Sequence, residues 1–194
     1  MKNLVLYAHP NPQSFNHAIL ETVTNKLKAN GHEVEVRDLY AMNYNPVLTG
    51  NDFEGYASGN LPEDIATEQK WVTWADHIIV IYPVWWTGLP AILKGYFDRV
   101  FSHGFAYRYT ATGIDKLLSG RSATLFTTQG NAAELYELNG TTKAMQLTSD
   151  VGIFEFVGMN VLDHRFYAAV PLVDDAARKE MLKDVERVID EQVK

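Results

Sequence analysis

The fold is decided by a nearly continuous apolar run, His77-Ile78-Ile79-Val80-Ile81-Tyr82, which ends at Pro83. A strand that is apolar on both faces must be covered on both faces, so this run is typical of the centre of a parallel sheet. Shorter runs lie at residues 3–8, 33–39, 122–126 and around 161. They alternate with amphipathic stretches, and this alternation predicts an α/β protein with a mostly parallel sheet and helices on both faces.

The amphipathic stretches between these runs predict the helices. In the first stretch, Ile19, Val23 and Leu27 recur every four residues on one face, and Ser14 can cap the helix start. Residues 40–61 lack clear periodicity, so we expect a long surface excursion there. Further helices are expected over about 62–75, 90–101, 142–157 and from 174 onward.

Composition narrows the class of protein. The 194 residues carry a net charge of −7, which argues against a surface that neutralises nucleic-acid phosphates. There is no cysteine, so any redox chemistry needs a cofactor. No stretch reaches the roughly 20 apolar residues of a membrane span, and the apolar run before His9 is too short for a signal peptide. We therefore expect one cytoplasmic domain over residues 1–194, with no nucleic-acid partner and no membrane insertion.

The loop after the first strand, residues 9–16, is a candidate anion site. In open parallel sheets, ligands bind beyond the carboxyl ends of the strands, near the point where the strand order reverses. This loop brings Ser14 and Asn16 to a helix N-terminus, where free backbone N–H groups favour a phosphate. The loop is equally consistent with a plain turn in which Ser14 only caps the helix.

The loop after the central strand, residues 82–90, concentrates Trp85 and Trp86 between two prolines. Aromatic side chains usually pack into a core. However, a strand end followed by Gly88 and Pro90 is a poor place to bury two indoles. The pattern favours a stacking surface for a flat heteroaromatic ligand.

The loop after the next strand, residues 127–130, offers hydroxyls, an amide and backbone N–H groups, which by themselves are a weak signal of a ligand site.

Neither a Gly-x-Gly-x-x-Gly nor a Gly-x-x-x-x-Gly-Lys pattern follows any strand, which argues against dinucleotide-binding Rossmann and P-loop sites. The six histidines show no metal-motif spacing, so no metal site is expected.

Several stretches together carry a family resemblance. They are Ala8-His9, Ser14-Phe15-Asn16, Gly88-Leu89-Pro90-Ala91-Ile92-Leu93-Lys94-Gly95-Tyr96-Phe97-Asp98-Arg99-Val100-Phe101, Gly104-Phe105-Ala106-Tyr107 and Thr127-Thr128. With these motifs the chain resembles the NAD(P)H:quinone oxidoreductases of the flavodoxin-2 group. That group includes DT-diaphorase, bacterial quinone reductases and ancillary flavoproteins of potassium efflux systems. The resemblance spans nearly the whole chain and implies a flavodoxin-like three-layer sandwich with a five-stranded parallel sheet of order 2-1-3-4-5.

The resemblance also implies a flavin site and an aromatic gate. Tyr107 and Tyr109 would form the gate over the substrate pocket, which the other subunit of a homodimer completes; a plain surface hairpin is the alternative for residues 101–109. The implied cofactor-binding residues are His9, Ser14, Phe15 and Asn16 for the phosphate and ribityl chain, Pro83, Val84, Trp85, Trp86 and Thr87 for the isoalloxazine edge, and Thr127, Thr128, Gln129, Gly130 and Tyr136 for the pyrimidine side.

The chain departs from the family pattern at two positions. Gln129 stands where glycine is common, which adds a side chain beside the flavin. Thr142 stands where the mammalian enzymes have a histidine, six residues after the position that matches Tyr136. Stabilisation of negative charge on the reduced flavin would then depend more on Tyr136, to which we assign a catalytic role.

The function implied is that of an NAD(P)H dehydrogenase (quinone). Such an enzyme passes a hydride from NADH or NADPH through bound flavin to a quinone or another small aromatic acceptor. FMN is preferred over FAD, although residues 43–61 are where FAD-using relatives make room for adenosine. Two other functions stay open: a regulatory subunit of a potassium efflux transporter, and a flavodoxin-type electron carrier, against which the tryptophan loop and the gate tyrosines weigh.

Overall fold

The main strands of the protein form one parallel sheet. The computed structural model describes residues 1–194, and five strands lie side by side in the order β2-β1-β3-β6-β7. All neighbours pair in parallel, which confirms the flavodoxin-like order 2-1-3-4-5. The strands are β1 (Lys2–Tyr7), β2 (Glu33–Asp38), β3 (His77–Pro83), β6 (Ser122–Thr128) and β7 (Asn160–Tyr167).

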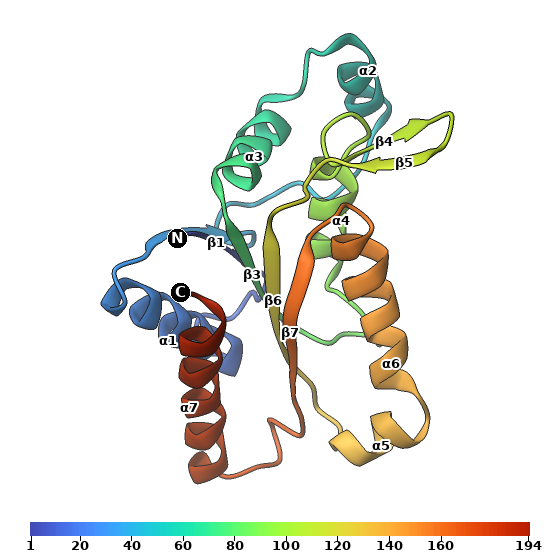
Figure 1. Ribbon diagram of the computed structural model, residues 1–194. Helices are drawn as coiled ribbons and strands as arrows, with labels where there is room; N and C mark the ends of the chain where they lie inside the picture. Colours follow the sequence, from blue (N-terminus) through green and yellow to red (C-terminus); the bar gives the residue numbers. More distant parts are fainter.

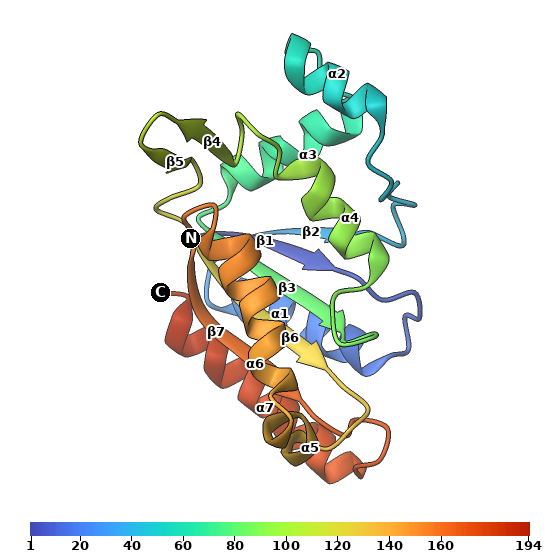
Figure 2. The same ribbon diagram turned by 90° about the vertical axis from the view of Figure 1, so that its right-hand side faces the viewer.

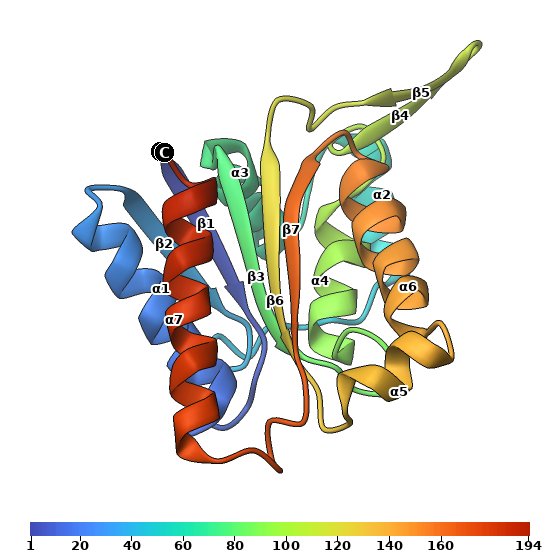
Figure 3. The same cartoon turned by 60° about the horizontal axis from the view of Figure 1, so that its bottom comes forward.

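Helices cover both faces of this sheet, so the fold has three layers (Figures 1 and 3). No helix is both long and apolar enough to cross a membrane. One face is covered by α1 (Phe15–Ala29) and α7 (Asp175–Gln192), and the other by α3 (Glu63–Trp74), α4 (Ala91–Val100), α6 (Thr141–Gln146) and a π-helix, η1 (Leu147–Glu155). Figure 2 shows the smaller elements toward the ends of the molecule: α2 (Gly50–Ser58), α5 (Ala133–Leu138) and a hairpin of β4 (Tyr107–Thr110) and β5 (Gly113–Lys116).

The central strand β3 is buried along its whole length, as its sequence predicts. Its side chains alternate between two cores because successive residues of a strand point to opposite faces. Ile79 and Ile81 pack in the core with residues of α1 and α7. Ile78, Val80 and Tyr82 pack in the core with residues of α3, α4 and η1.

The helix expected over residues 142–157 changes geometry in its second half. After α6 the chain widens into the π-helix η1, a geometry that is rare in proteins. Both Ser149 and Asp150 are buried there. Ser149 donates a hydrogen bond to Asp150 (2.7 Å), and the same carboxylate lies 2.8 Å from Nδ1 of His164 on β7. These polar contacts fix the widened turn against the edge strand.

The segment expected to be a surface excursion is packed against α4. Arg99 of α4 is buried and donates to both carboxylate oxygens of Asp52, at 3.1 and 3.0 Å. Pro46 packs so closely on α4 that a Cβ atom at Gly95 would lie 2.2 Å from the Pro46 carbonyl oxygen. Most of residues 40–61 lie at the surface, as expected, but residues 50–58 form the helix α2, which the sequence did not predict. Contacts with a distant helix leave no periodicity in the segment itself.

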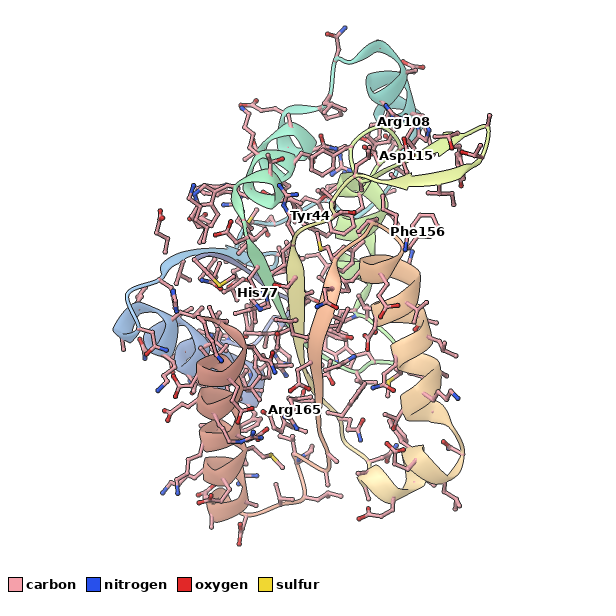
Figure 4. The ribbon with its side chains drawn as sticks, viewed as in Figure 1. Tyr44, His77, Arg108, Asp115, Phe156 and Arg165 are labelled. Carbon is pink, nitrogen blue, oxygen red and sulfur yellow. The ribbon has the colours of Figure 1, made fainter.

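His77, at the amino end of β3, is a buried histidine without an ionic partner (Figure 4). Its Nδ1 lies 2.7 Å from Oγ of Ser122 on the neighbouring strand. Burial lowers the pKa of His77 to about 4, because the imidazolium form loses its hydration. The folded protein therefore holds this ring neutral.

This burial predicts that acidification destabilises the fold. Between pH 6.5 and 4 the unfolded chain binds a proton at His77 that the folded chain excludes, so stability is full above about pH 6.5 and falls as the pH drops. Urea unfolding at pH 7 and pH 5 should show a loss of about 2 kcal/mol from this residue, and His77→Gln should remove that part of the loss. His103 is exposed, so the control variant His103→Gln should lose as much stability between pH 7 and pH 5 as the parent does. A His77→Gln variant with the parent's pH dependence would contradict the assignment.

Candidate functional site

A cavity of about 380 Å³ lies at the edge of the sheet where the parallel strands end. The loops that follow β1, β3, β6 and β7 form its walls. It brings together most of the predicted cofactor residues, namely His9, Ser14, Phe15, Asn16, Pro83, Val84, Trp85, Thr128, Gln129 and Gly130, and adds Val170 and Pro171.

The N-terminus of α1 forms one wall of this cavity. Ser14 is the N-cap, as predicted, and its Oγ accepts a hydrogen bond from the His17 backbone N–H at 3.2 Å. It also lines the cavity, so its role as N-cap does not exclude the predicted role in anion binding, which stays a prediction. Nδ1 of His9 is engaged with the Asn11 backbone, 3.1 Å from its nitrogen and 3.2 Å from its carbonyl oxygen, which leaves Nε2 as the ring nitrogen that can reach a ligand. The N–H groups of the helix N-terminus suit an anion.

Asn16 joins this helix to the loop after β6. Its side chain is buried, and Nδ2 donates to Oγ1 of Thr128 at 2.8 Å. The other end of the amide, Oδ1, is buried without a hydrogen-bond partner. Buried acceptors are almost always paired in native proteins, so the unpaired Oδ1 of Asn16 is unusual.

The loop after β3 is a tight turn with a strained backbone. Trp85 and Gly88 exchange two backbone hydrogen bonds of 3.1 Å, and the residues between them, Trp86 and Thr87, have positive φ angles of 51° and 63°. Turns of this type favour glycine and asparagine, since other side chains are strained at positive φ. Strain of this kind concentrates at functional sites. The Trp85 ring lies at the cavity, with its centroid 6.0 Å from that of His9.

Several predicted site residues lie outside the cavity walls. Trp86 and Thr87 are at the tip of the turn, and the Trp86 side chain is fully exposed at 102%. Thr127 is buried and donates to the Arg165 carbonyl at 3.0 Å. Tyr136 lies on α5, a helix with no buried residue. Their roles in binding stay predictions.

The two gate tyrosines lie at the other end of the sheet from the cavity. The hairpin that carries Tyr107 and Tyr109 stands beyond the amino ends of β3, β6 and β7, whereas the cavity is at their carboxyl ends (Figures 1 and 4). The Tyr107 ring contacts Phe156 and Tyr109, with centroids 5.2 and 5.5 Å apart. The structure therefore does not bring Tyr107 and Tyr109 to the cavity of their own chain.

Three residues near the site were not predicted from the sequence. Val170 and Pro171 follow β7, and the rule that ligands bind at the carboxyl ends of strands applies to that strand as well. Asn131 donates from Nδ2 to the phenol oxygen of Tyr136 at 3.1 Å. Asparagine in a loop carries no signal of its own, so only the structure could find that contact.

The fold and this cavity define a flavodoxin-like protein with its ligand site at the carboxyl edge of the sheet. The chain belongs to the Flavodoxin_2 family, described as having a flavodoxin-like fold, whose model matches residues 1–189.

Relatives and a solved structure agree with this family. The chain is 38% identical over 184 residues to a protein of Haemophilus influenzae named an uncharacterized NAD(P)H oxidoreductase, covering 94% of this chain and 91% of that one. It is 36% identical to the NAD(P)H dehydrogenase [quinone] 1 of Rattus norvegicus, covering 93% and 73%. The structure of an NAD(P)H:quinone oxidoreductase from Methanothermobacter marburgensis superposes with a TM-score of 0.84 at 31% identity, covering 97% and 96%.

The strained turn predicts a gain in stability when Thr87 becomes glycine. Thr87→Gly should stabilise the fold by about 1 kcal/mol, because glycine adopts the positive φ without strain. Thermal unfolding measures this gain. In the matched control, Thr112→Gly, an exposed turn residue with negative φ loses its side chain, and stability should fall slightly. A Thr87→Gly variant that is less stable than the parent would show that the turn is not strained.

Proposed function

We propose that the protein is a flavin-dependent NAD(P)H oxidoreductase that reduces quinones or similar small aromatic acceptors. The observation that carries the proposal is the cavity in which a helix N-terminus, a buried amide and an indole meet. Its relatives named as NAD(P)H oxidoreductase and NAD(P)H dehydrogenase [quinone] support the same activity. The predicted cytoplasmic location stays a prediction.

The residues of the cavity fit a flavin. The N-terminus of α1 suits a phosphate, and the His9 ring lies in the same cavity wall. Ser14, Asn16 and Thr128 line the cavity with hydroxyl and amide groups, which can form hydrogen bonds with the hydroxyls of a ribityl chain. Trp85 is only 40% exposed and offers an aromatic surface at the cavity wall.

When bound, a flavin would accept a hydride from a nicotinamide and deliver it to the acceptor. The protein's part is to hold the rings in place and to stabilise negative charge. Asn131 donates to the phenol oxygen of Tyr136, which leaves the phenol proton free to be donated. We assign to Tyr136 the role of a hydrogen-bond donor that stabilises this negative charge, and to Asn131 the role of orienting the Tyr136 phenol.

FMN is the flavin that we propose, with FAD as the alternative. Residues 43–61 would have to make room for an adenosine. In this chain that segment is tied to α4 by the buried pair of Arg99 and Asp52 and by the contact of Pro46 with Gly95. This packing supports the smaller cofactor.

We also propose that the active form is a homodimer. Because Tyr107 and Tyr109 lie at the far end of the sheet from their own cavity, a second copy must supply them. A groove of about 320 Å³ beneath the hairpin, lined by the apolar residues Phe97, Ile153 and Phe156 and by the charged residues Lys94 and Asp98, suits a mixed polar and apolar contact with that copy.

Replacing Tyr136 tests the donor role. Tyr136→Phe should slow NADPH-dependent quinone reduction by the FMN-loaded protein roughly tenfold, because one charge-stabilising donor is lost. Asn131→Ala should slow it less, since the phenol is kept but is no longer oriented. Steady-state NADPH oxidation measures both rates. Tyr109→Phe, which keeps the gate ring, is the control and should retain the parent's rate, whereas an unchanged Tyr136→Phe rate would remove the role.

Mixing two inactive variants tests the shared site. One carries Tyr107→Ala and Tyr109→Ala, and the other carries Asn16→Leu in the cavity. After refolding together in equal amounts, half of the dimers are mixed, and each mixed dimer has one intact site. The mixture should therefore recover about a quarter of the parent's quinone reductase activity. If each gate closes its own chain's cavity, the mixture stays inactive.

A further inference from the structure

The dipeptide Asn-Gly occurs twice in the chain, at Asn30-Gly31 and at Asn139-Gly140. In both places the asparagine is exposed and ends a helix, α1 at Asn30 and α5 at Asn139. The φ and ψ angles match closely, at −81° and 2° for Asn30 and −95° and 3° for Asn139. Both glycines have a positive φ, 78° at Gly31 and 77° at Gly140. The two sites therefore differ mainly in their surroundings.

An asparagine before glycine can lose its side-chain amide without an enzyme, because glycine has no side chain to hinder its own backbone nitrogen. That nitrogen gives up its proton and attacks Cγ of the asparagine, and negative charge develops on Oδ1. The bond from Cγ to Nδ2 then breaks, and Nδ2 leaves as ammonia after it takes up the proton through water. A second water opens the resulting succinimide ring to aspartate or isoaspartate.

At Asn139 the oxygen that gains charge in this reaction already accepts two hydrogen bonds. Thr141 donates both of them to Oδ1, from its backbone N–H at 3.0 Å and from its hydroxyl at 2.5 Å. Donors aimed at a developing oxyanion stabilise the transition state more than the ground state. Thr141 therefore favours attack on Cγ of Asn139.

At Asn30 the opposite end of the amide is held. Its Nδ2, the leaving nitrogen, donates to the Asp190 carboxylate on α7 at 2.9 Å, and its Oδ1 accepts no hydrogen bond from the protein. A hydrogen bond from an amide N–H to a carboxylate is charge-assisted and draws the amide nitrogen's electrons toward the carbonyl. Cγ of Asn30 is therefore the poorer electrophile.

The two glycine nitrogens also differ in how easily they are freed for attack. The Gly31 N–H donates to the Lys28 carbonyl at 3.0 Å, and the Gly140 N–H donates to the Glu137 carbonyl at 3.2 Å. Helix α1 has 15 residues, five of them buried, and packs beside α7. Helix α5 has six residues, none of them buried, and lies at an outer corner of the molecule (Figures 1 and 3). Short helices with few buried contacts open more often, so the nitrogen of Gly140 is freed more often.

We propose that Asn139 is a site of spontaneous deamidation, favoured by the two donors of Thr141 and by the weakly held end of α5. Asn30 is protected, although it has the same dipeptide and the same backbone conformation. The product adds a negative charge where α5 meets α6 and, as isoaspartate, one more backbone atom. This joint lies one helical turn after Tyr136. The inference does not depend on the proposed function, because the reaction needs only the polypeptide and water.

The test follows both asparagines in one sample. The purified full-length protein is kept in mildly alkaline buffer over several weeks and digested at intervals. Mass spectrometry with fragmentation then locates the mass increase that accompanies replacement of NH2 by OH. In the folded protein Asn139 should deamidate at least about tenfold faster than Asn30. In concentrated urea the two rates should agree within about threefold, because only the folded surroundings distinguish the sites.

Two variants test the role of Thr141. Thr141→Val keeps the shape of the side chain without the hydroxyl donor and should slow deamidation of folded Asn139 at least about threefold, with Asn30 unchanged. Thr141→Ser keeps the donor and should retain the parent's rate. Equal rates at the two sites of the folded parent, or a faster rate at Asn30, would overturn the proposal. A Thr141→Val rate at or above that of the parent would overturn it as well.

Discussion

Burial of β3 on both faces is the constraint on which the rest of the structure depends. A strand with no solvent-facing side needs a neighbour on each edge and helices above and below. The chain meets this need with β1 and β6 at the edges, α1 and α7 on one face, and α3, α4 and η1 on the other. Even the ionisable residue His77 is buried in this strand, and burial lowers its pKa so that the ring stays neutral.

The same constraint sends the polar chemistry to one edge of the sheet. Parallel strands pair their backbone N–H and C=O groups with one another inside the sheet, so free backbone N–H groups and strained turns lie in the loops where the strands end. The loops after β1, β3, β6 and β7 meet there around one cavity. The positive φ angles of Trp86 and Thr87 also lie at this edge, in the loop after β3.

Structural features that depend on local interactions could be predicted from local sequence patterns. The apolar run of β3, the cap at Ser14 and the strand order implied by the family motifs are all found in the structure. Features that depend on distant partners were not predictable. The helix α2 is held by Arg99, 47 residues away in sequence from Asp52. The outward direction of the Trp86 side chain depends on a left-handed backbone that a Trp-Trp pair does not reveal.

The central claim is that a flavin in this cavity takes a hydride from a nicotinamide. Anaerobic stopped-flow absorbance tests it most directly, with FMN-loaded protein mixed with NADPH and separately with NADH, and no acceptor present. Rapid and complete bleaching of the oxidised flavin band with at least one of the two nucleotides is the predicted result. Tight flavin binding without bleaching by either nucleotide would contradict the claim and would favour an electron carrier or a regulatory flavoprotein.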